Sequence, residues 1–510
     1  MTLPCPTART AYGLVSGTEA FLSGVTVFKG VPYGASTAGP NRWRPPLPPA
    51  RWDGTRLADT FGPICPQPPS NLADPALPRG EDCLNLNIWT AAGQPDERLP
   101  VLVWLHGGRF LYGSGADPQY DGSALAAQGL VVVTVNSRLG VLGYLATPEL
   151  SAESADETSG NYGLLDQIAA LRWVRSNIAA FGGDPERVTI AGQSSGAASV
   201  MDLVYSPFAA GLFHGAVADS AVLHPGDPAI ATLAPSHRTL AQAERDGTVY
   251  ARACGADAPG QLRALPVETV LAGSAADDPR IPGTPPPPLF RPVVDGAVLP
   301  DTYAGVLAAG TQNDVPLLLG NNRDESGAGP GVKLTVAEYE RRAAGRYGDF
   351  AAEFLTLYPV TTDTAASAQH TAARADSART STHLWAQEWA NGTESPVFTH
   401  FWTRTPPGPE GAARGAFHGS EIPYLLGSLH ALDRPWAEED RQTSTLLTAY
   451  LVNFATNGDP NGPDLPAWPT TRSDRPEVFE TGHGWAPIPL AEPARTDFHR
   501  RFLRARTTTW

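Results

Sequence analysis

Runs of apolar residues alternate with segments of helical spacing over the first half of the chain. Residues 101–105 and 130–135 are almost unbroken apolar runs, as expected for strands buried on both faces of a sheet. Between 164 and 181 the apolar residues recur every three or four positions, which predicts a helix. A strand at 188–191 and a helix-compatible segment at 197–205 follow. This alternation predicts an α/β protein with a mostly parallel sheet covered by helices on both faces.

The flanking segments have shorter patterns. Residues 10–35 alternate brief apolar runs with Gly, which predicts short strands and tight turns, and 81–89 alternate like a half-buried strand. Toward the C-terminus the predicted elements are strands at 315–319 and 397–402, a helix that begins at a capping box (Thr335 and Glu338), and a helix over 446–454 that stops at Asn457-Gly-Asp-Pro460.

Length and charge narrow the function classes. The 510 residues suit several average domains, or one large core with long insertions. Lys and Arg total 37 against 52 Asp and Glu, a net charge of −15, which repels nucleic-acid phosphates and anionic membranes. No apolar run reaches the roughly 18 residues of a membrane-spanning helix, and the first ten residues lack a secretory pattern. We therefore expect a soluble protein, cytoplasmic or secreted, that does not bind nucleic acid.

Gly192-Gln-Ser-Ser-Gly196 is the single G-x-S-x-G sequence in the chain. A predicted strand enters it and a helix-compatible segment leaves it, and the two glycines permit the tight turn that would expose Ser194. The start of a helix also offers free N–H groups to an oxyanion. The alternative is a Gly-rich turn that carries an inert Ser.

A nucleophilic Ser requires a general base, and the base requires an acid that orients it. Among eleven His residues, His418 lies between small residues, whereas His106 lies in a Gly turn where a structural role is open. Asp324 and Glu325 both follow a predicted strand, where catalytic loops lie in open α/β sheets. The residue pattern alone leaves both the base and the acid undecided.

Leu105-His-Gly-Gly-Arg-Phe110 follows a buried strand with two consecutive glycines. Such a turn can direct backbone N–H groups at a developing oxyanion, although an ordinary strand-to-helix turn has the same pattern. No Cys and His cluster has zinc spacing, and no Gly-rich phosphate loop is present. The sequence thus predicts neither a metal nor a cofactor.

Motifs spread over residues 10–490 resemble those of type-B carboxylesterases, the cholinesterase/carboxylesterase family with an α/β-hydrolase fold. The matching segments, in chain order, are Phe28-Lys-Gly-Val-Pro-Tyr-Gly34, Glu81-Asp-Cys-Leu-Asn-Leu-Asn-Ile-Trp89, Asn161-Tyr-Gly-Leu-Leu-Asp-Gln167, Phe181-Gly-Gly-Asp-Pro185, Pro292-Val-Val-Asp-Gly296, the segment around His418, and Asn457-Gly-Asp-Pro-Asn-Gly462. The resemblance implies one domain over 1–510, with a mostly parallel twisted central sheet flanked by helices and large loop and helical insertions that form a gorge.

The resemblance also implies roles for individual residues. Ser194 matches the nucleophile, Glu325 the triad acid and His418 the general base. The residues that would assist this triad are the oxyanion-hole donors Gly108, Arg109 and Ser195, through their backbone N–H groups, and Ser220, which would steady the triad.

The implied reaction is hydrolysis of a small-molecule carboxylic ester through an acyl-enzyme on Ser194, by a monomer or weak homodimer. One alternative is a specialised hydrolase of carboxylate-bearing esters, carbamates or amides. The other is a catalytically silent binding protein of the same fold, although all three triad residues are present.

Two departures from the family pattern lie at the predicted site. Gln193-Ser194-Ser195 replaces the commoner Glu-Ser-Ala, with little effect expected because Ser195 keeps its backbone N–H. Arg109 replaces the usual third Gly. Its cationic side chain could narrow the pocket or attract an acyl group that bears a carboxylate. Alternatively, it could turn outward or pair with an acidic neighbour.

The cysteines bear on a loop near this site. Cys65 and Cys83 match the family's first disulfide, which would close an Ω-like loop (66–82) at the gorge rim. Cys254 lacks the Cys that would match its family partner, so we expect a free thiol there. Arg42 and Glu81 match a family ion pair at the base of the loop, which we expect here too; as a surface contact it would contribute little energy.

Overall fold

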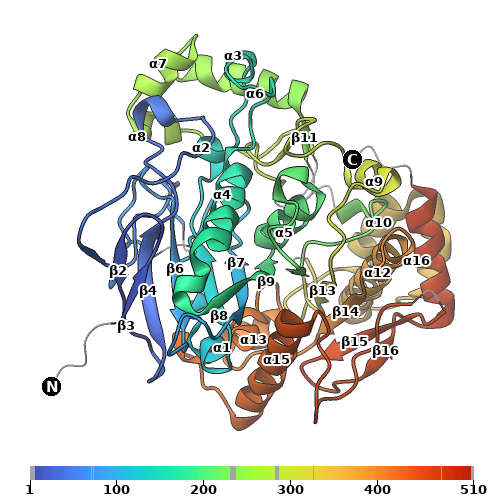
Figure 1. Ribbon diagram of the computed structural model, residues 1–510. Helices are drawn as coiled ribbons and strands as arrows, with labels where there is room; N and C mark the ends of the chain where they lie inside the picture. The colour runs from blue at the N-terminus through green and yellow to red at the C-terminus, as the bar shows by residue number, and fades with distance from the viewer. Residues whose placement is uncertain are drawn as a thin grey trace.

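An eleven-stranded sheet runs through the computed structural model (Figure 1), which describes residues 6–506 except 71, 73, 230–236, 282–285, 326 and 473. Seven neighbouring strands, from β15 to β8, are parallel, and the strands at both edges are antiparallel. In spatial order they are β16 (Pro487–Pro489), β15 (Glu477–Thr481), β14 (Val397–Trp402), β13 (Leu317–Asn322), β10 (Gly215–Asp219), β9 (Gly183–Gln193), β7 (Leu99–Leu105), β8 (Val131–Val135), β6 (Asn85–Thr90), β4 (Thr26–Pro32) and β3 (Thr18–Glu19).

Two small sheets and the helices complete the described fold. One small sheet joins β1 (Thr7–Arg9), β2 (Leu14–Ser16) and β5 (Thr55–Leu57), and the other pairs β11 (Arg238–Thr239) with β12 (Val293–Val294). The helices are α1 (Ser123–Ala127), α2 (Gly140–Tyr144), α3 (Pro148–Ala152), α4 (Tyr162–Asn177), α5 (Ser195–Tyr205), α6 (Leu240–Ala253), α7 (Pro259–Ala264), α8 (Val267–Leu271), α9 (Tyr303–Ala309), α10 (Val336–Tyr347), α11 (Ala351–Leu357), α12 (Asp363–Asn391), α13 (Pro409–Arg414), α14 (Ile422–Leu425), α15 (Glu438–Asn457) and α16 (Pro493–Ala505).

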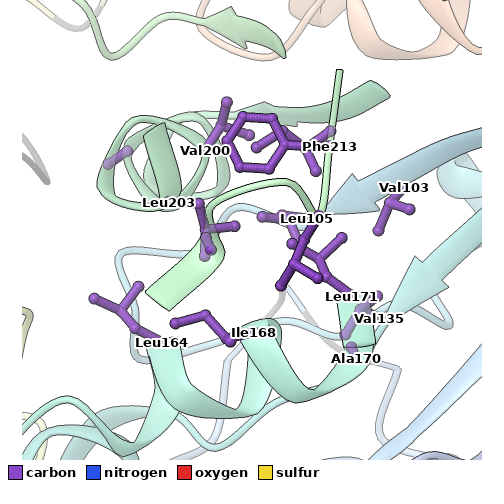
Figure 2. Packing of buried hydrophobic residues seen from close by; sticks show 14 of the residues in the cluster. Val103, Leu105, Val135, Leu164, Ile168, Ala170, Leu171, Val200, Leu203 and Phe213 are labelled. Carbon is purple, nitrogen blue, oxygen red and sulfur yellow. The ribbon is translucent and has the colours of Figure 1, made fainter. Parts of the chain in front are cut away.

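Both faces of the sheet are covered because alternate residues of each central strand point to opposite sides. In β7, Val101, Val103 and Leu105 join the core beneath α4, α5 and α12, whereas Leu102 and Trp104 join the core beneath α1, α14 and α15. Figure 2 shows side chains of α4 and α5 converging beside Leu105 on the first of these faces. The unbroken apolar run of β7 therefore reflects burial on both faces, as predicted.

The predicted α/β-hydrolase fold is confirmed, and the differences are local. Of the short strands predicted over 10–35, the apolar runs on either side of Gly30 form one strand, β4, because a bulge between Phe28 and Val31 keeps them in one ladder with Gly30 at φ +65°. The helix predicted over 164–181 is α4 followed by a 3₁₀ turn (Ile178–Phe181). Within the described residues, no helix has both the length and the apolar character needed to cross a membrane.

The predicted disulfide between Cys65 and Cys83 is not formed, which corrects that prediction. Both residues are buried free thiols, and the backbone N–H of Leu139 donates to Cys65 Sγ at 3.3 Å. A hydrogen bond with Cys65, together with burial, raises the pKa of the Cys83 thiol. Cys254 is a half-buried free thiol, as expected, and Cys5 lies outside the described residues.

The predicted ion pair at the base of the 66–82 segment is confirmed, but it is not a surface contact. Arg42 Nε lies 2.5 Å from Glu81 Oε1, and the two side chains are only 7% and 10% exposed. Arg42 also donates to the backbone carbonyls of Arg263 and Leu265. Because the pair is buried, removal of one partner would leave an uncompensated charge, which is far more costly than loss of an exposed pair. That residues 66–82 act as an Ω-like rim loop stays a prediction.

Candidate active site

Ser194 occupies a strained turn between β9 and α5. Its backbone has φ +58° and ψ −127°, and its N–H donates to the carbonyl of Asp219 at 2.9 Å. A β-carbon added to Gly196 would lie 2.0 Å from the carbonyl oxygen of Leu105, and one added to Gly192 would lie 2.5 Å from Gly196. Only glycines permit this close approach, so the turn forms as the G-x-S-x-G pattern predicts, and Ser194 is partly exposed amid buried neighbours.

The other predicted site residues follow neighbouring parallel strands. In the order β13, β10, β9, β7, the strands end just before Glu325, Ser220, Ser194 and the turn at 106–110. The carboxyl ends of parallel strands share one edge of the sheet. His418 reaches this edge through the segment that follows β14, where a parallel bridge joins Phe417 to Asp324.

Glu325 and His418 form a hydrogen-bonded pair, with Glu325 Oε2 2.6 Å from His418 Nδ1. The second carboxylate oxygen of Glu325 accepts the backbone N–H of Asn322 at 3.0 Å. Burial alone would lower the pKa of His418, but the Glu325 carboxylate outweighs it, so that pKa lies above its ordinary value. Burial likewise would raise the pKa of Glu325, yet His418, Ser220 and Asn322 together lower it. The pair therefore favours a carboxylate beside an imidazole of raised basicity.

Asp324, the alternative acid, is directed away from His418. Its carboxylate accepts from the Arg323 guanidinium at 2.8 Å and from the backbone N–H of Ala416 at 2.7 Å. Its own N–H donates to the carbonyl of Ala416 at 3.0 Å. Asp324 thus attaches the His418 segment to the end of β13, while Glu325 meets the imidazole.

The contact between Ser194 and His418 is indirect in this structure. Among the hydrogen bonds of the described residues, none joins Ser194 Oγ to the imidazole, and the nearest partner of His418 Nε2 is Gln193 Nε2 at 3.4 Å. Catalytic hydrogen bonds are often long in the absence of substrate. Through this contact, Nε2 of His418 lies beside the residue that precedes Ser194.

The turn at 106–110 packs directly against Ser194. A β-carbon added to Gly107 would lie 3.3 Å from the Cβ of Ser194. The backbone N–H groups of Gly108, Arg109 and Ser195 donate to no acceptor among the described residues. His106 bonds the carbonyl of Gly107 at 2.8 Å and is not part of the Glu325–His418 pair. The turn therefore presents unused donors next to the serine.

Ser220 lies at the end of β10 with φ +61°, and its N–H donates to the carbonyl of Gly320 at 2.8 Å. Its buried hydroxyl faces Glu325 and helps to lower the pKa of that carboxylate, although the geometry is not that of a regular hydrogen bond. This position agrees with the supporting role that the resemblance implies.

Arg109 is paired rather than free. Its Nη2 donates to Asp277 Oδ1 at 2.7 Å and to the carbonyl of Pro286 at 2.5 Å, and its side chain is 34% exposed. Of the alternatives left open by the sequence, the structure has the pairing with an acidic neighbour. Asp277 is 168 positions away in the chain, so no local pattern could have identified it.

A second carboxyl group lies beneath the pair. Glu421 is 1% exposed, and its Oε2 accepts from the Asn322 side chain. Burial and the negative charges of Asp219 and Glu325 raise the pKa of Glu421 to about 8. Asp219 in turn bonds His400 Nε2 at 2.7 Å. Sequence reasoning missed this group, because the segment His418-Gly-Ser-Glu421 gives no sign that its Glu is buried.

Among the residues that the structure describes, no three His, Cys, Asp or Glu side chains gather in a way that could hold a metal ion.

A strained serine after a central parallel strand, with a His–carboxylate pair on the same sheet edge, is the arrangement of an α/β-hydrolase. The chain belongs to the carboxylesterase family, whose sequence pattern matches residues 4–486, and it is a carboxylic ester hydrolase of type B.

Several relatives of the chain are esterases. A fumonisin B1 esterase of Sphingopyxis macrogoltabida is 38% identical over 491 residues, which span 90% of this chain and 84% of that protein. The para-nitrobenzyl esterase of Bacillus subtilis (strain 168) is 34% identical over 487 residues, which span 92% of this chain and 93% of that protein. A solved PNB esterase superposes with a TM-score of 0.78 at 30% identity, over 98% of this chain and all of the other.

Proposed function

We propose that the protein is a serine carboxylesterase that cleaves its ester through an acyl-enzyme on Ser194, with His418 as general base and Glu325 as the acid that orients it. The observation that supports this most strongly is the 2.6 Å contact between Glu325 and His418 on the sheet edge that carries the strained Ser194.

The reaction follows from these positions. His418 Nε2 takes the proton of Ser194 Oγ as that oxygen bonds to the ester carbonyl carbon, and the carbonyl electron pair becomes an oxyanion. The backbone N–H groups of Gly108, Arg109 and Ser195 receive the oxyanion. When the carbonyl re-forms, the C–O bond to the alcohol breaks and the alcohol leaves with the proton from His418. Water then repeats the sequence on the acyl-enzyme, which releases the acid.

Hydrolysis of p-nitrophenyl acetate, with and without the serine, tests the proposal. We expect a burst of p-nitrophenolate equal to the enzyme concentration, followed by steady turnover, and loss of both in Ser194→Ala. Equal rates in the two proteins would refute the proposal and favour a binding protein of the same fold.

The relatives suggest which esters to test first as substrates. Because one of them is a para-nitrobenzyl esterase, para-nitrobenzyl esters of increasing acyl length are the natural first series. Paired neutral and carboxylate-bearing acyl groups then test the specialised alternative. Arg109 already has a carboxylate partner in Asp277, so we expect the neutral esters to be preferred.

A further inference from the structure

Arg109 lies in a stretch of backbone that normally suits glycine. Gly108, Arg109 and Phe110 have consecutive positive φ angles of +119°, +61° and +60°. A non-glycine residue in this conformation is strained and persists where the surroundings fix it. Two side chains of this turn should therefore be anchored.

Phe110 is anchored from the interior. Its side chain is buried, and its ring packs edge-on against Tyr144 with centroids 5.3 Å apart. Its carbonyl accepts the backbone N–H of Gly140 at 2.6 Å. The core therefore fixes one end of the turn.

Arg109 is anchored from the opposite direction. Its two acceptors, the Asp277 carboxylate and the Pro286 carbonyl, lie on two facing segments, 276–281 and 286–289, which together we call the Asp277 arm. Arg109 is thus the residue that connects the turn to this arm through two hydrogen bonds from one nitrogen.

The two segments of the Asp277 arm are bonded to each other and to the core. Two backbone hydrogen bonds of 2.8 Å join its segments, from Asp278 to Pro287 and from Leu289 to Ala276. The Asp278 carboxylate is buried and accepts from Arg291 at 3.1 Å. The backbone of the neighbouring residue, Asp277, which receives the Arg109 guanidinium, is held as well, because an antiparallel bridge joins it to Pro288.

We propose that Arg109 is a positioning residue whose side chain straps the 106–110 turn to the Asp277 arm and so holds the turn's backbone N–H donors on the oxyanion. The inference rests on the proposed function and assigns the guanidinium to holding the turn, not to binding a substrate carboxylate. Oxyanion donors act mainly in the transition state, so their displacement lowers kcat far more than it changes KM.

Three variants isolate the strap. Arg109→Met keeps the backbone N–H and much of the side-chain length but removes both hydrogen bonds. Asp277→Ala removes the charged acceptor of the pair, and Arg109→Lys keeps the positive charge and a single donor nitrogen on a shorter side chain. The control is Arg501→Met, which breaks the Arg501–Glu353 pair between α16 and α11, whose side chains are 47% and 43% exposed.

The measurements are kcat and KM for p-nitrophenyl acetate, thermal unfolding, and inhibition by an alkyl trifluoromethyl ketone. Ser194 Oγ bonds to the ketone carbon, the carbonyl electron pair becomes an oxyanion, and the serine proton passes to His418. The inhibition constant therefore reports on the oxyanion donors without turnover.

We expect Arg109→Met and Asp277→Ala each to lower kcat about tenfold and to weaken the ketone about tenfold, with KM within about twofold. The double variant should be no worse than either single variant, Arg109→Lys should recover part of the loss, and Arg501→Met should match the wild type.

The proposal is overturned if Arg109→Met keeps kcat and ketone affinity within about twofold of the wild type. It is also overturned if the two losses multiply in the double variant. If Arg109→Met does not fold, Asp277→Ala and Arg109→Lys decide by the same criteria. A wild type whose turnover equals that of Ser194→Ala would instead refute the proposed function itself.

Discussion

Two glutamates near His418 have opposite protonation preferences, and their surroundings explain why. Glu325 faces the imidazole and a backbone N–H, which lower its pKa, whereas burial and the charges of two nearby carboxylates raise the pKa of Glu421 to about 8. Carboxyl groups whose pKa values are pushed apart in this way take different roles. Glu325 suits the anion that supports His418, whereas Glu421 suits a carboxyl group that stays neutral below about pH 8.

The pH dependence of the reaction tests the first of these roles. The neutral imidazole is the active base, so kcat/KM should rise with pH through the pKa of His418, which lies above 6.5 because of Glu325. Glu325→Gln removes the charge that stabilises the protonated imidazole. The rise of kcat/KM with pH (the acid limb of the profile) should therefore move to lower pH, and kcat should fall roughly a thousandfold.

Asp324→Asn is the matched control for that experiment. Asp324 bonds Arg323 and Ala416 instead of His418, so its variant should keep the midpoint of the acid limb even if stability falls. An unchanged midpoint in Glu325→Gln would contradict the assigned acid.

The stability of the protein tests the state of Glu421. A carboxyl whose pKa is higher in the folded protein costs nothing below its unfolded pKa near 4.5, and its cost grows until pH passes the folded value of about 8. Glu421→Gln removes this cost. The free energy of unfolding of the variant, relative to the wild type, should therefore rise by about 3–4 kcal/mol between pH 5 and pH 8.

Urea unfolding at several pH values measures the difference for Glu421→Gln. Glu340→Gln, on the exposed side of α10, serves as the control and should leave the difference flat. Parallel curves for wild type and Glu421→Gln would mean that Glu421 titrates as an ordinary carboxyl.

Single residues were predictable from sequence where chemistry and local pattern coincide. Ser194 has a strand–turn–helix context of its own, so the pattern identifies it. His418 and Glu325 needed the family resemblance, because neither a His among small residues nor one of two adjacent acids is unique. Asp277 and the burial of Glu421 were not predictable, since both depend on contacts between distant parts of the chain.

At the level of elements, the site depends on how closely β7 and the start of α5 approach. The β-carbon of Gly196→Ala would lie 2.0 Å from the Leu105 carbonyl, so the helix start and the 106–110 turn must separate. We expect a loss of about 1–3 kcal/mol in stability, and a fall in kcat of at least about a hundredfold because nucleophile and donors move apart.

Gly345→Ala provides the comparison for Gly196→Ala. Gly345 lies in α10, where an added β-carbon meets nothing within 4 Å, so alanine should raise stability by about 0.5–1 kcal/mol with unchanged kcat. If Gly196→Ala behaved like Gly345→Ala in chemical unfolding and ester turnover, close packing of Gly196 against Leu105 would not be required for stability or activity.

Elements were predictable where burial is uniform along them. The apolar runs of β7 and β8 announce strands buried on both faces, and the helical period of α4 continues to its end. The single strand β4 was not predictable as one element, because its bulge at Gly30 interrupts the pattern while the ladder to β6 continues. The hydrophobic pattern of a segment reflects its local environment, whereas the unbroken pairing of β4 depends on its partner strand, β6.

At the level of the whole molecule, both cores use residues from distant parts of the chain. The core on the α4 and α5 face includes residues from Ala8 to Val397, and the core on the other face includes residues from Val25 to Phe479. The proposed triad likewise extends from 194 to 418. Neither core can form from one half of the sequence, so we expect the chain to unfold as one cooperative unit.

Cysteine labelling under increasing urea tests this expectation on the reduced protein. Cys65 and Cys83, at 2% and 0% exposure, lie beside β6 and β8, whereas half-buried Cys254 lies at the end of α6. Cys254 should therefore react with N-ethylmaleimide in the native protein, and Cys65 and Cys83 only on unfolding. Peptide mapping assigns each label.

Buried tryptophans such as Trp104 and Trp402 report on strands in both halves of the sheet, so their fluorescence should change in the same urea range as the labelling of Cys83. A fluorescence transition that precedes labelling of Cys83 would show that the half of the sheet around β13 and β14 unfolds separately, and the expectation of one cooperative unit would be wrong.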